Sequence, residues 1–299
     1  MNMKDLSQLA ITDPHCHFWD LSLGYNGWIS DRESDLLGPL NPLNKNYLPT
    51  DYLADTAGYS IQKFIHIEAA STRFAKNEVE WLIELSKKTD KLAGIVAGAD
   101  LLDVQVEQLL EYYSGISLIK GIRQILNWHN NSKYTAADRH DNLVNPLWHK
   151  HFSLLEKYRL SFDMQICPTQ MKQAYALAKK YHQVLIIIDH AGMPIEEDLP
   201  IWKQGIKELS QCENVMIKLS GFGMLNHDWT QQSIEAYIHY VLEHFGMDRC
   251  MFAGNFPVDK LYHDFSTIIE TYYSIVESAS LDEKQKLFSK NAERIYRLS

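Results

Sequence analysis

The stretch Val184-Leu-Ile-Ile-Ile-Asp-His190 contains the most apolar predicted strand in the chain and points to its fold. Its five consecutive apolar residues leave no polar side that the strand could turn toward water. A continuous and largely β-branched run is typical of a parallel strand that helices cover on both faces. The run ends in Asp189 and His190, so polar side chains follow directly at the carboxyl end of a buried strand.

Seven further segments have the length and composition of strands, and segments with helical periodicity lie between them. These expected strands cover residues 11–17, 64–68, 92–99, 118–123, 160–166, 215–219 and 250–253. Eight strand–helix units without a linker predict an α/β fold, a single (β/α)8 TIM barrel over residues 1–299. The alternative is an open doubly wound sheet, which we disfavour because no glycine-rich phosphate loop follows the first strand.

Composition restricts the classes of partner. Of 299 residues, 45% are hydrophobic and 22% charged, as in ordinary globular proteins. The net charge of −9 argues against nucleic acid or an anionic membrane surface as a partner. No apolar run approaches the roughly 20 residues of a membrane span, no signal-peptide core is present, and the four cysteines form no Cys-x-x-Cys pair. We expect a cytoplasmic monomer or homodimer that acts on a small molecule.

The first expected strand ends in the motif Asp13-Pro-His-Cys-His-Phe-Trp-Asp20. Successive side chains on a strand point to opposite faces, so His15 and His17 share one face. Two imidazoles at a strand end suit a zinc-type ion or a polarised carbonyl oxygen. The alternative is that both are hydrogen-bonded histidines without a function, and only partners from other strands can decide between the two.

A long connection over residues 18–46 follows this motif and carries Trp19, Tyr25 and Trp28. Loops of this length inside a compact domain usually serve as a lid or as a pocket wall. A surface excursion packed by its own aromatic side chains is an almost equally good interpretation.

Polar side chains recur where the expected strands end, which is where TIM barrels carry their active sites. The set is His15, His17, His66, Glu68, Arg123, His190, Lys218, Ser220 and Asn255. Individually, His66 could be a hydrogen-bonded core imidazole, Lys218 half of a barrel-interior ion pair, and Arg123 a structural clamp. Packing alone does not account for so many of them at one end, and we therefore predict an active site there.

These motifs resemble those of a known family. Residues 13–20 are similar to the opening motif of the amidohydrolase superfamily, in its amidohydrolase 2 branch. Four further segments resemble later motifs of that branch, namely Lys120-Gly-Ile-Arg123, Asp189-His-Ala-Gly192, Lys218-Leu-Ser220 and Gly254-Asn-Phe-Pro-Val258. The resemblance covers nearly the whole chain and is greatest to sugar-acid lactonases and 2-pyrone-4,6-dicarboxylate lactonase. Decarboxylases belong to the same branch.

The resemblance implies roles for particular residues. His15, His17 and His190 would hold one divalent metal ion, zinc by preference, or would polarise the lactone carbonyl directly without a metal. Arg123 would bind a carboxylate or carbonyl of the substrate, for which a planar guanidinium is well shaped. The remaining pocket residues would be His66 and Lys218, with Trp128 from the loop after residues 118–123.

Two departures from the family pattern affect these expectations. The fifth strand offers Asp163, Gln165 and Cys167 but no histidine, which argues against a binuclear metal site. The eighth strand has Asn255 where many relatives have an aspartate base, with Asp259 four residues later. An amide cannot accept a proton at neutral pH, so we expect His190 as the base with Asn255 orienting water, and Asp259 as the second candidate.

We therefore expect a hydrolase that opens a small sugar-acid or related carboxylated lactone by attack of water on its carbonyl. The alternatives are a metal-dependent decarboxylase on the same barrel and a pocket protein that has lost catalysis. Asn255 is the residue that most favours the last of these.

Overall fold

Eight parallel strands lie side by side in the order in which they occur in the chain. The structure, a computed structural model, describes residues 3–30 and 33–298. The strands are β1 (Ala10–Cys16), β4 (Ser60–Ile67), β5 (Leu92–Gly98), β6 (Ile119–Ile125), β7 (Ser161–Gln165), β8 (Ile186–Ile188), β9 (Val215–Leu219) and β10 (Cys250–Phe252). Neighbours from β1 to β10 form parallel ladders, as the buried β-branched runs predicted.

The last strand returns to the first and closes the ring. The backbone N–H of Asn255 donates to the His15 carbonyl, and that of His17 donates to the Phe256 carbonyl, each at 2.7 Å. The Asp13 carboxylate supports this closure, because its Oδ1 accepts from Gly254 N at 2.9 Å and from His15 N at 3.0 Å. The predicted (β/α)8 barrel is confirmed, and its closure brings the first and last strand ends together.

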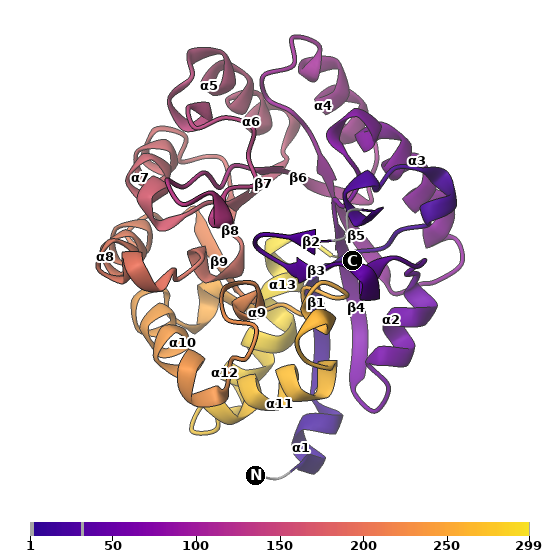
Figure 1. Cartoon of the computed structure of the whole chain (residues 1–299), viewed down its shortest axis with the longest axis vertical. Coiled ribbons are helices and arrows are strands. Elements are labelled where there is room, and N and C mark those ends of the chain that lie inside the picture. The colour runs from indigo at the N-terminus through magenta and orange to yellow at the C-terminus, as the bar shows by residue number, and fades with distance from the viewer. Residues whose placement is uncertain (1–2, 31–32, 299) are drawn as a thin grey trace.

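Helices surround the ring of strands (Figure 1). They are α1 (Met3–Gln8), α2 (Pro49–Asp55), α3 (Ala75–Ser86), α4 (Val106–Ser114), α5 (Pro146–Phe152), α6 (Leu154–Tyr158), α7 (Met171–Lys180), α8 (Leu199–Leu209), α9 (Phe222–Leu225), α10 (Gln231–Phe245), α11 (Phe265–Ile275), α12 (Leu281–Gln285) and α13 (Asn291–Ile295). Within residues 3–30 and 33–298, no helix is long and apolar enough to cross a membrane.

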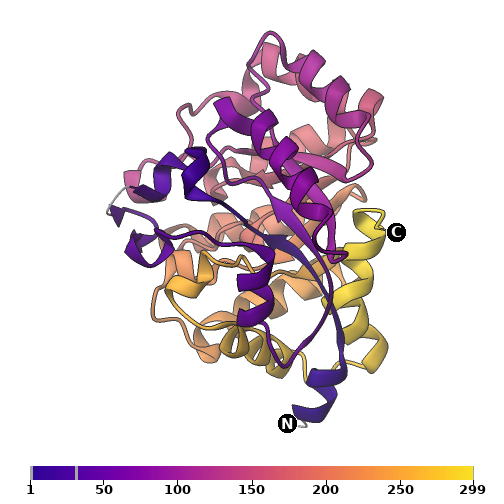
Figure 2. The ribbon, with the colours of Figure 1, turned by 90° about the vertical axis from the view of Figure 1, so that its right-hand side faces the viewer.

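The two ends of the barrel are closed differently. At one end, Ile295 of α13 and the following Tyr296 pack against the apolar interior of the barrel, which includes Ile65, Ile187 and Met251. At the other end lies a hairpin of β2 (Glu33–Ser34) and β3 (Gly38–Pro39), opposite α13 (Figure 2). Among the described residues, the interior is therefore filled at the α13 end, and the cavity opens at the hairpin end.

The hairpin is held over this open end by apolar and polar contacts. Leu36 at its tip packs in a buried cluster with Met193, Met224 and Val258, which lie in the segments after β8, β9 and β10. The Tyr262 hydroxyl donates to the Leu37 carbonyl at 3.0 Å. The long connection is thus a pocket wall, one of the two interpretations that the sequence left open.

Candidate active site

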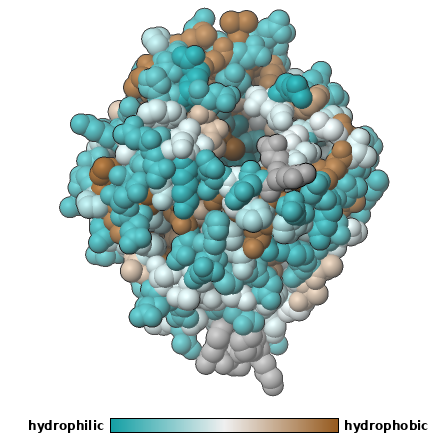
Figure 3. Space-filling model, viewed as in Figure 1, coloured by the Kyte–Doolittle hydropathy of each residue, from teal (hydrophilic) through white to brown (hydrophobic). Residues whose placement is uncertain are grey.

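A cavity of about 690 Å³ opens at the carboxyl ends of the strands. The space-filling view shows it as a hollow near the centre of the face (Figure 3). Its wall includes the hairpin residues 33–37 and part of the loop after β6. The strand-end side chains that line it are His17, Glu68, Arg123, Gln165, His190 and Asn255. These six converge from β1, β4, β6, β7, β8 and β10 as a barrel site requires.

Three histidine rings lie in contact at the floor of the cavity. The ring centroid of His15 is 5.0 Å from that of His17 and 4.8 Å from that of His190. His17 Nδ1 donates to the Ile67 carbonyl at 2.8 Å, so its Nε2 carries a lone pair. His190 Nδ1 is hydrogen-bonded to Ser220 Oγ at 3.0 Å. Backbone and side-chain partners therefore fix the orientation of both rings that line the cavity.

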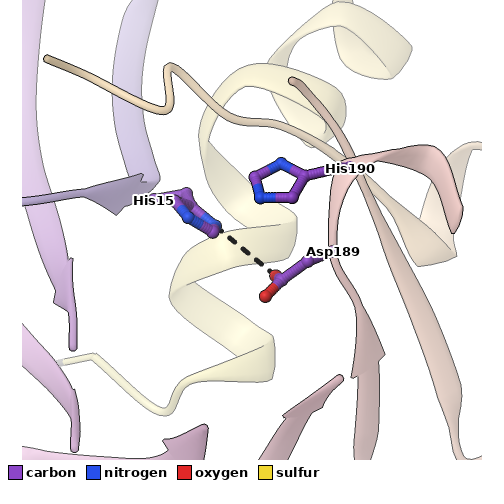
Figure 4. A group of neighbouring side chains, drawn as sticks. All are labelled: His15, Asp189 and His190. Atoms are coloured by element: carbon purple, nitrogen blue, oxygen red, sulfur yellow. Dashed lines mark ion pairs between the residues drawn. The ribbon is translucent and has the colours of Figure 1, made fainter. Parts of the chain in front are cut away.

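Beneath the floor lies a fully buried ion network. Lys218 Nζ is 2.5 Å from Asp163 Oδ2, 3.0 Å from Asp189 Oδ1 and 3.2 Å from His15 Nδ1. The Tyr296 hydroxyl donates to the same Asp163 oxygen at 2.6 Å. An ammonium group can only donate, so the contact with Lys218 favours a lone pair on His15 Nδ1 and a proton on Nε2, whereas Asp189 Oδ1, 3.4 Å from the same Nδ1, favours the opposite tautomer. His15 Nε2 is buried without a hydrogen-bond partner in the described residues, and Figure 4 shows the ring facing Asp189.

All three imidazoles are neutral at physiological pH. Burial lowers the pKa of His15 well below its usual value, and the Lys218 charge lowers it further. Burial also lowers the pKa of His17, together with the Arg123 charge. The pKa of His190 falls to about 3, again mainly through burial. The site therefore presents uncharged imidazoles, which can accept or share a proton or bind a metal ion.

Arg123 and Glu68 form an ion pair on the cavity wall. Arg123 Nε donates to Glu68 Oε1 at 2.9 Å, and its Nη2 donates to the Glu68 backbone carbonyl at 2.7 Å. Arg123 Nη1 lies 3.8 Å from Asp189 Oδ2. Two of its three nitrogens are thus occupied by Glu68, and the fork is fixed in one orientation at the edge of the cavity.

Asn255 and Asp259 form a second fixed pair. The backbone φ angles of Asn255 and His190 are 52° and 53°, and both lie in the left-handed region. Asn255 Nδ2 donates to Asp259 Oδ1 at 2.9 Å, and Asp259 Oδ2 accepts from Gly221 N at 3.2 Å. Burial raises the pKa of Asp259 to about 7. The geometry orients the Asn255 amide, with Asp259 behind it and outside the cavity lining.

A family profile described as amidohydrolase matches residues 12–298 of the chain. The chain belongs to the amidohydrolase family. An uncharacterised relative, y4mH of Sinorhizobium fredii, is 35% identical over 297 residues, which are 98% of this chain and 100% of the relative. An L-fucono-1,5-lactonase of Burkholderia ambifaria is 23% identical over 262 residues, which are 85% of this chain and 82% of the lactonase. The resemblance inferred from the motifs is confirmed.

Among solved structures, an amidohydrolase from Burkholderia multivorans with bound zinc superimposes with a TM-score of 0.83. The two are 22% identical, and the alignment covers 97% of this chain and 100% of that one. At this identity the likeness establishes the barrel fold alone.

The amidohydrolase barrel brings some of the predicted site residues into the cavity and leaves others outside it. His17, Arg123, His190 and Asn255 line the cavity, and His15 lies directly below it. Three predicted substrate contacts do not line it, namely His66, Lys218 and Trp128. His66 Nδ1 accepts from Phe18 N at 3.1 Å behind the site, and Trp128 packs against His140 at 5.3 Å.

For Lys218 and His66, the observed positions support the structural roles that the sequence left open as alternatives. Lys218 is half of a barrel-interior ion pair, because it is fully buried between two aspartates and does not line the cavity. His66 is a hydrogen-bonded core imidazole with 0% exposure. We therefore withdraw both, and Trp128, as direct substrate contacts. Asp259, the second candidate base, is buried with 4% exposure.

Two functional candidates of the amidohydrolase escaped assignment from sequence. Asp189 was visible in the motif Asp189-His-Ala-Gly192, yet only the structure puts it beside His15 and His190, with ligand atoms of the three within 4.8 Å of one another. Glu68 was visible as a strand-end carboxylate, yet its cavity position depends on its pairing with Arg123. The available signal in both cases was an acidic residue at the end of a buried strand.

Proposed function

We propose that the protein is a hydrolase that opens a small sugar-acid lactone by attack of water on the ring carbonyl. The observation that carries this proposal is the convergence of neutral His17 and His190 with Arg123 and Asn255 in one cavity. Fixed hydrogen-bond donors around a carbonyl oxygen stabilise the oxyanion that develops in such a reaction. The lactonase name of the Burkholderia ambifaria relative supports the same reaction class.

Each residue has a distinct task in this proposal. Arg123 holds the carbonyl or a neighbouring oxygen of the lactone with the nitrogen that Glu68 leaves free. His15, in the tautomer that Lys218 favours, contributes its unpartnered Nε2–H from below, where negative charge develops. Asn255, oriented by Asp259, holds the attacking water through its amide oxygen. His17 and His190 exclude bulk water from the floor and accept hydrogen bonds from the substrate.

One divalent metal ion, with zinc preferred, also fits the residues present. The ligand atoms of His15, Asp189 and His190 lie within 4.8 Å of one another. His17, whose ring adjoins that of His15, presents a further lone pair on Nε2. When bound, the ion would act as a Lewis acid toward the carbonyl oxygen. Lys218 opposes binding because it favours a proton on His15 Nε2, and we therefore propose that the protein also works without metal.

A zinc titration tests this part of the proposal. We expect metal-free protein to take up at most one equivalent of zinc, with little dependence on pH near neutrality because the buried imidazoles are already unprotonated there. Isothermal calorimetry and elemental analysis give the stoichiometry. His17→Asn should abolish the uptake, and His244→Asn, on α10, is the matched control. Two zinc ions retained per chain after dialysis against a chelator would contradict a mononuclear site.

A panel of lactones tests the proposed function itself. Wild-type protein is incubated with sugar 1,4- and 1,5-lactones, with carboxylated lactones, and with aromatic carboxylic acids as decarboxylase substrates. Proton release and product identification by mass spectrometry separate hydrolysis, which adds water, from decarboxylation, which releases carbon dioxide. Binding without turnover of any compound would indicate a pocket protein and contradict the proposal.

We also propose that the protein acts in the cytoplasm, as a monomer or a homodimer, on a small-molecule substrate. Its four cysteines are free and buried, as is usual in a reducing compartment. Light scattering gives the oligomeric state.

A further inference from the structure

Hydrolysis requires a group that takes a proton from water, and the residues named so far supply it poorly. The Asn255 amide has no basic lone pair at neutral pH. His190 remains neutral only because burial disfavours its charged form, and the same cause makes it a weak base. Asp259 does not line the cavity, and its two oxygens are held by Asn255 and Gly221. The floor and the β10 side of the site therefore lack an effective base.

The Glu68 carboxylate meets the geometric requirements. It follows directly after β4, next to Ile67, whose carbonyl fixes the ring of His17. Its side chain lines the cavity and is 13% exposed. Arg123 Nε binds Oε1 at 2.9 Å, and no hydrogen bond among the described residues involves Oε2. One oxygen is anchored, and the other is free to accept a hydrogen bond from a water in the cavity.

The charges around Glu68 also suit a base. Arg123 on β6 favours the carboxylate, whereas Glu78 on α3 and Asp189 after β8 disfavour it. Burial has the largest effect, and the pKa of Glu68 is raised overall. His17, the neutral neighbour on the β1 side, adds no charge. A carboxylate whose pKa is raised toward the working pH is a better proton acceptor than an exposed one.

We propose that Glu68 is the general base of the site, in the role that an aspartate at the end of the last strand would otherwise fill. This inference rests on the proposed lactone hydrolysis. Among the acidic side chains that line the cavity, Glu68 is the one fixed by an arginine that itself reaches toward the floor. Asn255 then orients the water, and Glu68 removes its proton.

The proposed step balances. Glu68 takes one proton from water as the water oxygen forms a bond to the carbonyl carbon, and the carbonyl π electrons move to the carbonyl oxygen. When the tetrahedral intermediate collapses, the bond from that carbon to the ring oxygen breaks. The protonated Glu68 returns its proton to the leaving ring oxygen. The product is a hydroxy acid, which releases its own proton to solvent at neutral pH, and Glu68 is again a carboxylate.

Glu68→Gln separates this role from a purely positioning role. The amide oxygen of glutamine can still accept from Arg123 Nε, so the fork stays in place while the base is removed. We expect kcat on the active lactone to fall about 100- to 10,000-fold, with KM changed much less. The acidic limb of the pH profile of kcat, on which wild-type activity rises as Glu68 loses its proton, should disappear. Glu68→Asp, which keeps a carboxylate, should retain that limb at a reduced rate.

Glu78→Gln is the matched control, because it removes a buried negative charge from the same region. The Glu78 carboxylate accepts from the backbone N–H groups of Ala69 and Ala70 and does not line the cavity. Its loss should leave an acidic limb, displaced to lower pH because one like charge near Glu68 is gone. Thermal unfolding checks that each variant is folded.

The outcomes distinguish the two proposals. If wild type hydrolyses a lactone and the kcat of Glu68→Gln is within tenfold of the wild-type value, the assignment of Glu68 is overturned and the lactonase proposal stands. An unchanged acidic limb in the pH profile of Glu68→Gln would have the same meaning. Wild type inactive on every lactone would overturn both.

Discussion

Replacing Lys218 with methionine should lower the free energy of unfolding by about 3–5 kcal/mol. The ammonium group is fully buried between Asp163 and Asp189, which are themselves fully buried. Methionine fills a similar volume but leaves two carboxylates without a counter-charge, and an uncompensated buried charge is costly. Denaturant unfolding followed by tryptophan fluorescence measures the change.

The stability lost in Lys218→Met should increase with pH. Even with Lys218 present, burial raises the pKa of Asp163 to about 6. A carboxyl group whose pKa is higher in the folded protein contributes most stability below its unfolded pKa, and this contribution is lost as the pH rises through the folded value. Without Lys218 the folded pKa rises further, so the variant should lose more stability at pH 8 than at pH 5.

Lys260→Met is the matched control for this prediction. Lys260 also pairs with an aspartate, Asp55, at 2.5 Å, but its side chain is 38% exposed. Water screens such a pair, and its loss should cost less than about 1 kcal/mol. Equal losses in the two variants would show that the buried network is not what stabilises the barrel interior.

Arg123→Lys should lower kcat/KM on the active lactone by about 100- to 1,000-fold, the range for loss of one fixed oxyanion donor. The arginine uses two nitrogens to bind the side chain and backbone of Glu68 and has a third available to the cavity. A lysine has one nitrogen on a flexible stem and cannot bind Glu68 and substrate in the same geometry. Steady-state kinetics measure the loss.

Arg249→Lys is the control for loss of a fixed guanidinium elsewhere. Arg249 donates to the backbone carbonyls of Phe245, Cys212 and Ser210, and none of these residues lines the cavity. We expect this variant to have a lower melting temperature but an unchanged kcat/KM for the folded fraction. Full activity of Arg123→Lys would remove Arg123 from the site.

The strands were predictable because burial on both faces leaves a visible apolar run. Val215–Leu219 matches the expected strand at both ends. The expected strand over residues 184–190 is shortened to Ile186–Ile188, because the chain turns at His190 with a positive φ that composition does not reveal. The hairpin at residues 33–39 was not predicted, since two-residue strands carry no periodicity.

The sequence predicted which end of the barrel carries the site, but not how deeply each predicted side chain is buried. Alternation along a strand indicates which side chains point inward, and Lys218 points inward on the same face of β9 as Met216. It does not indicate how deeply a side chain lies, and Lys218 proves to be fully buried beneath the cavity. His66 lies on the opposite face of β4 from the interior residues Ile65 and Ile67, and it packs behind the site against Phe18 and Glu78. Glu68 shows the converse, because its ion pair with Arg123, 55 residues away in sequence, sets its position on the cavity wall.

The closure of β10 on β1 also determines when the site can exist during folding. The hydrogen bond from Gly254 N to Asp13 joins residues 241 positions apart, and Thr12 bonds Ser289 and Glu293 across 277 and 281 positions. Loop-closure entropy opposes such contacts, and they form slowly compared with pairings between consecutive strands. A partly folded chain with β1 to β9 assembled has His15, His17, Arg123 and His190 in place but lacks Asn255, because β1 pairs with the consecutive strand β4. Recovered activity therefore reports the last step of folding, whereas helix content and fluorescence report the earlier ones.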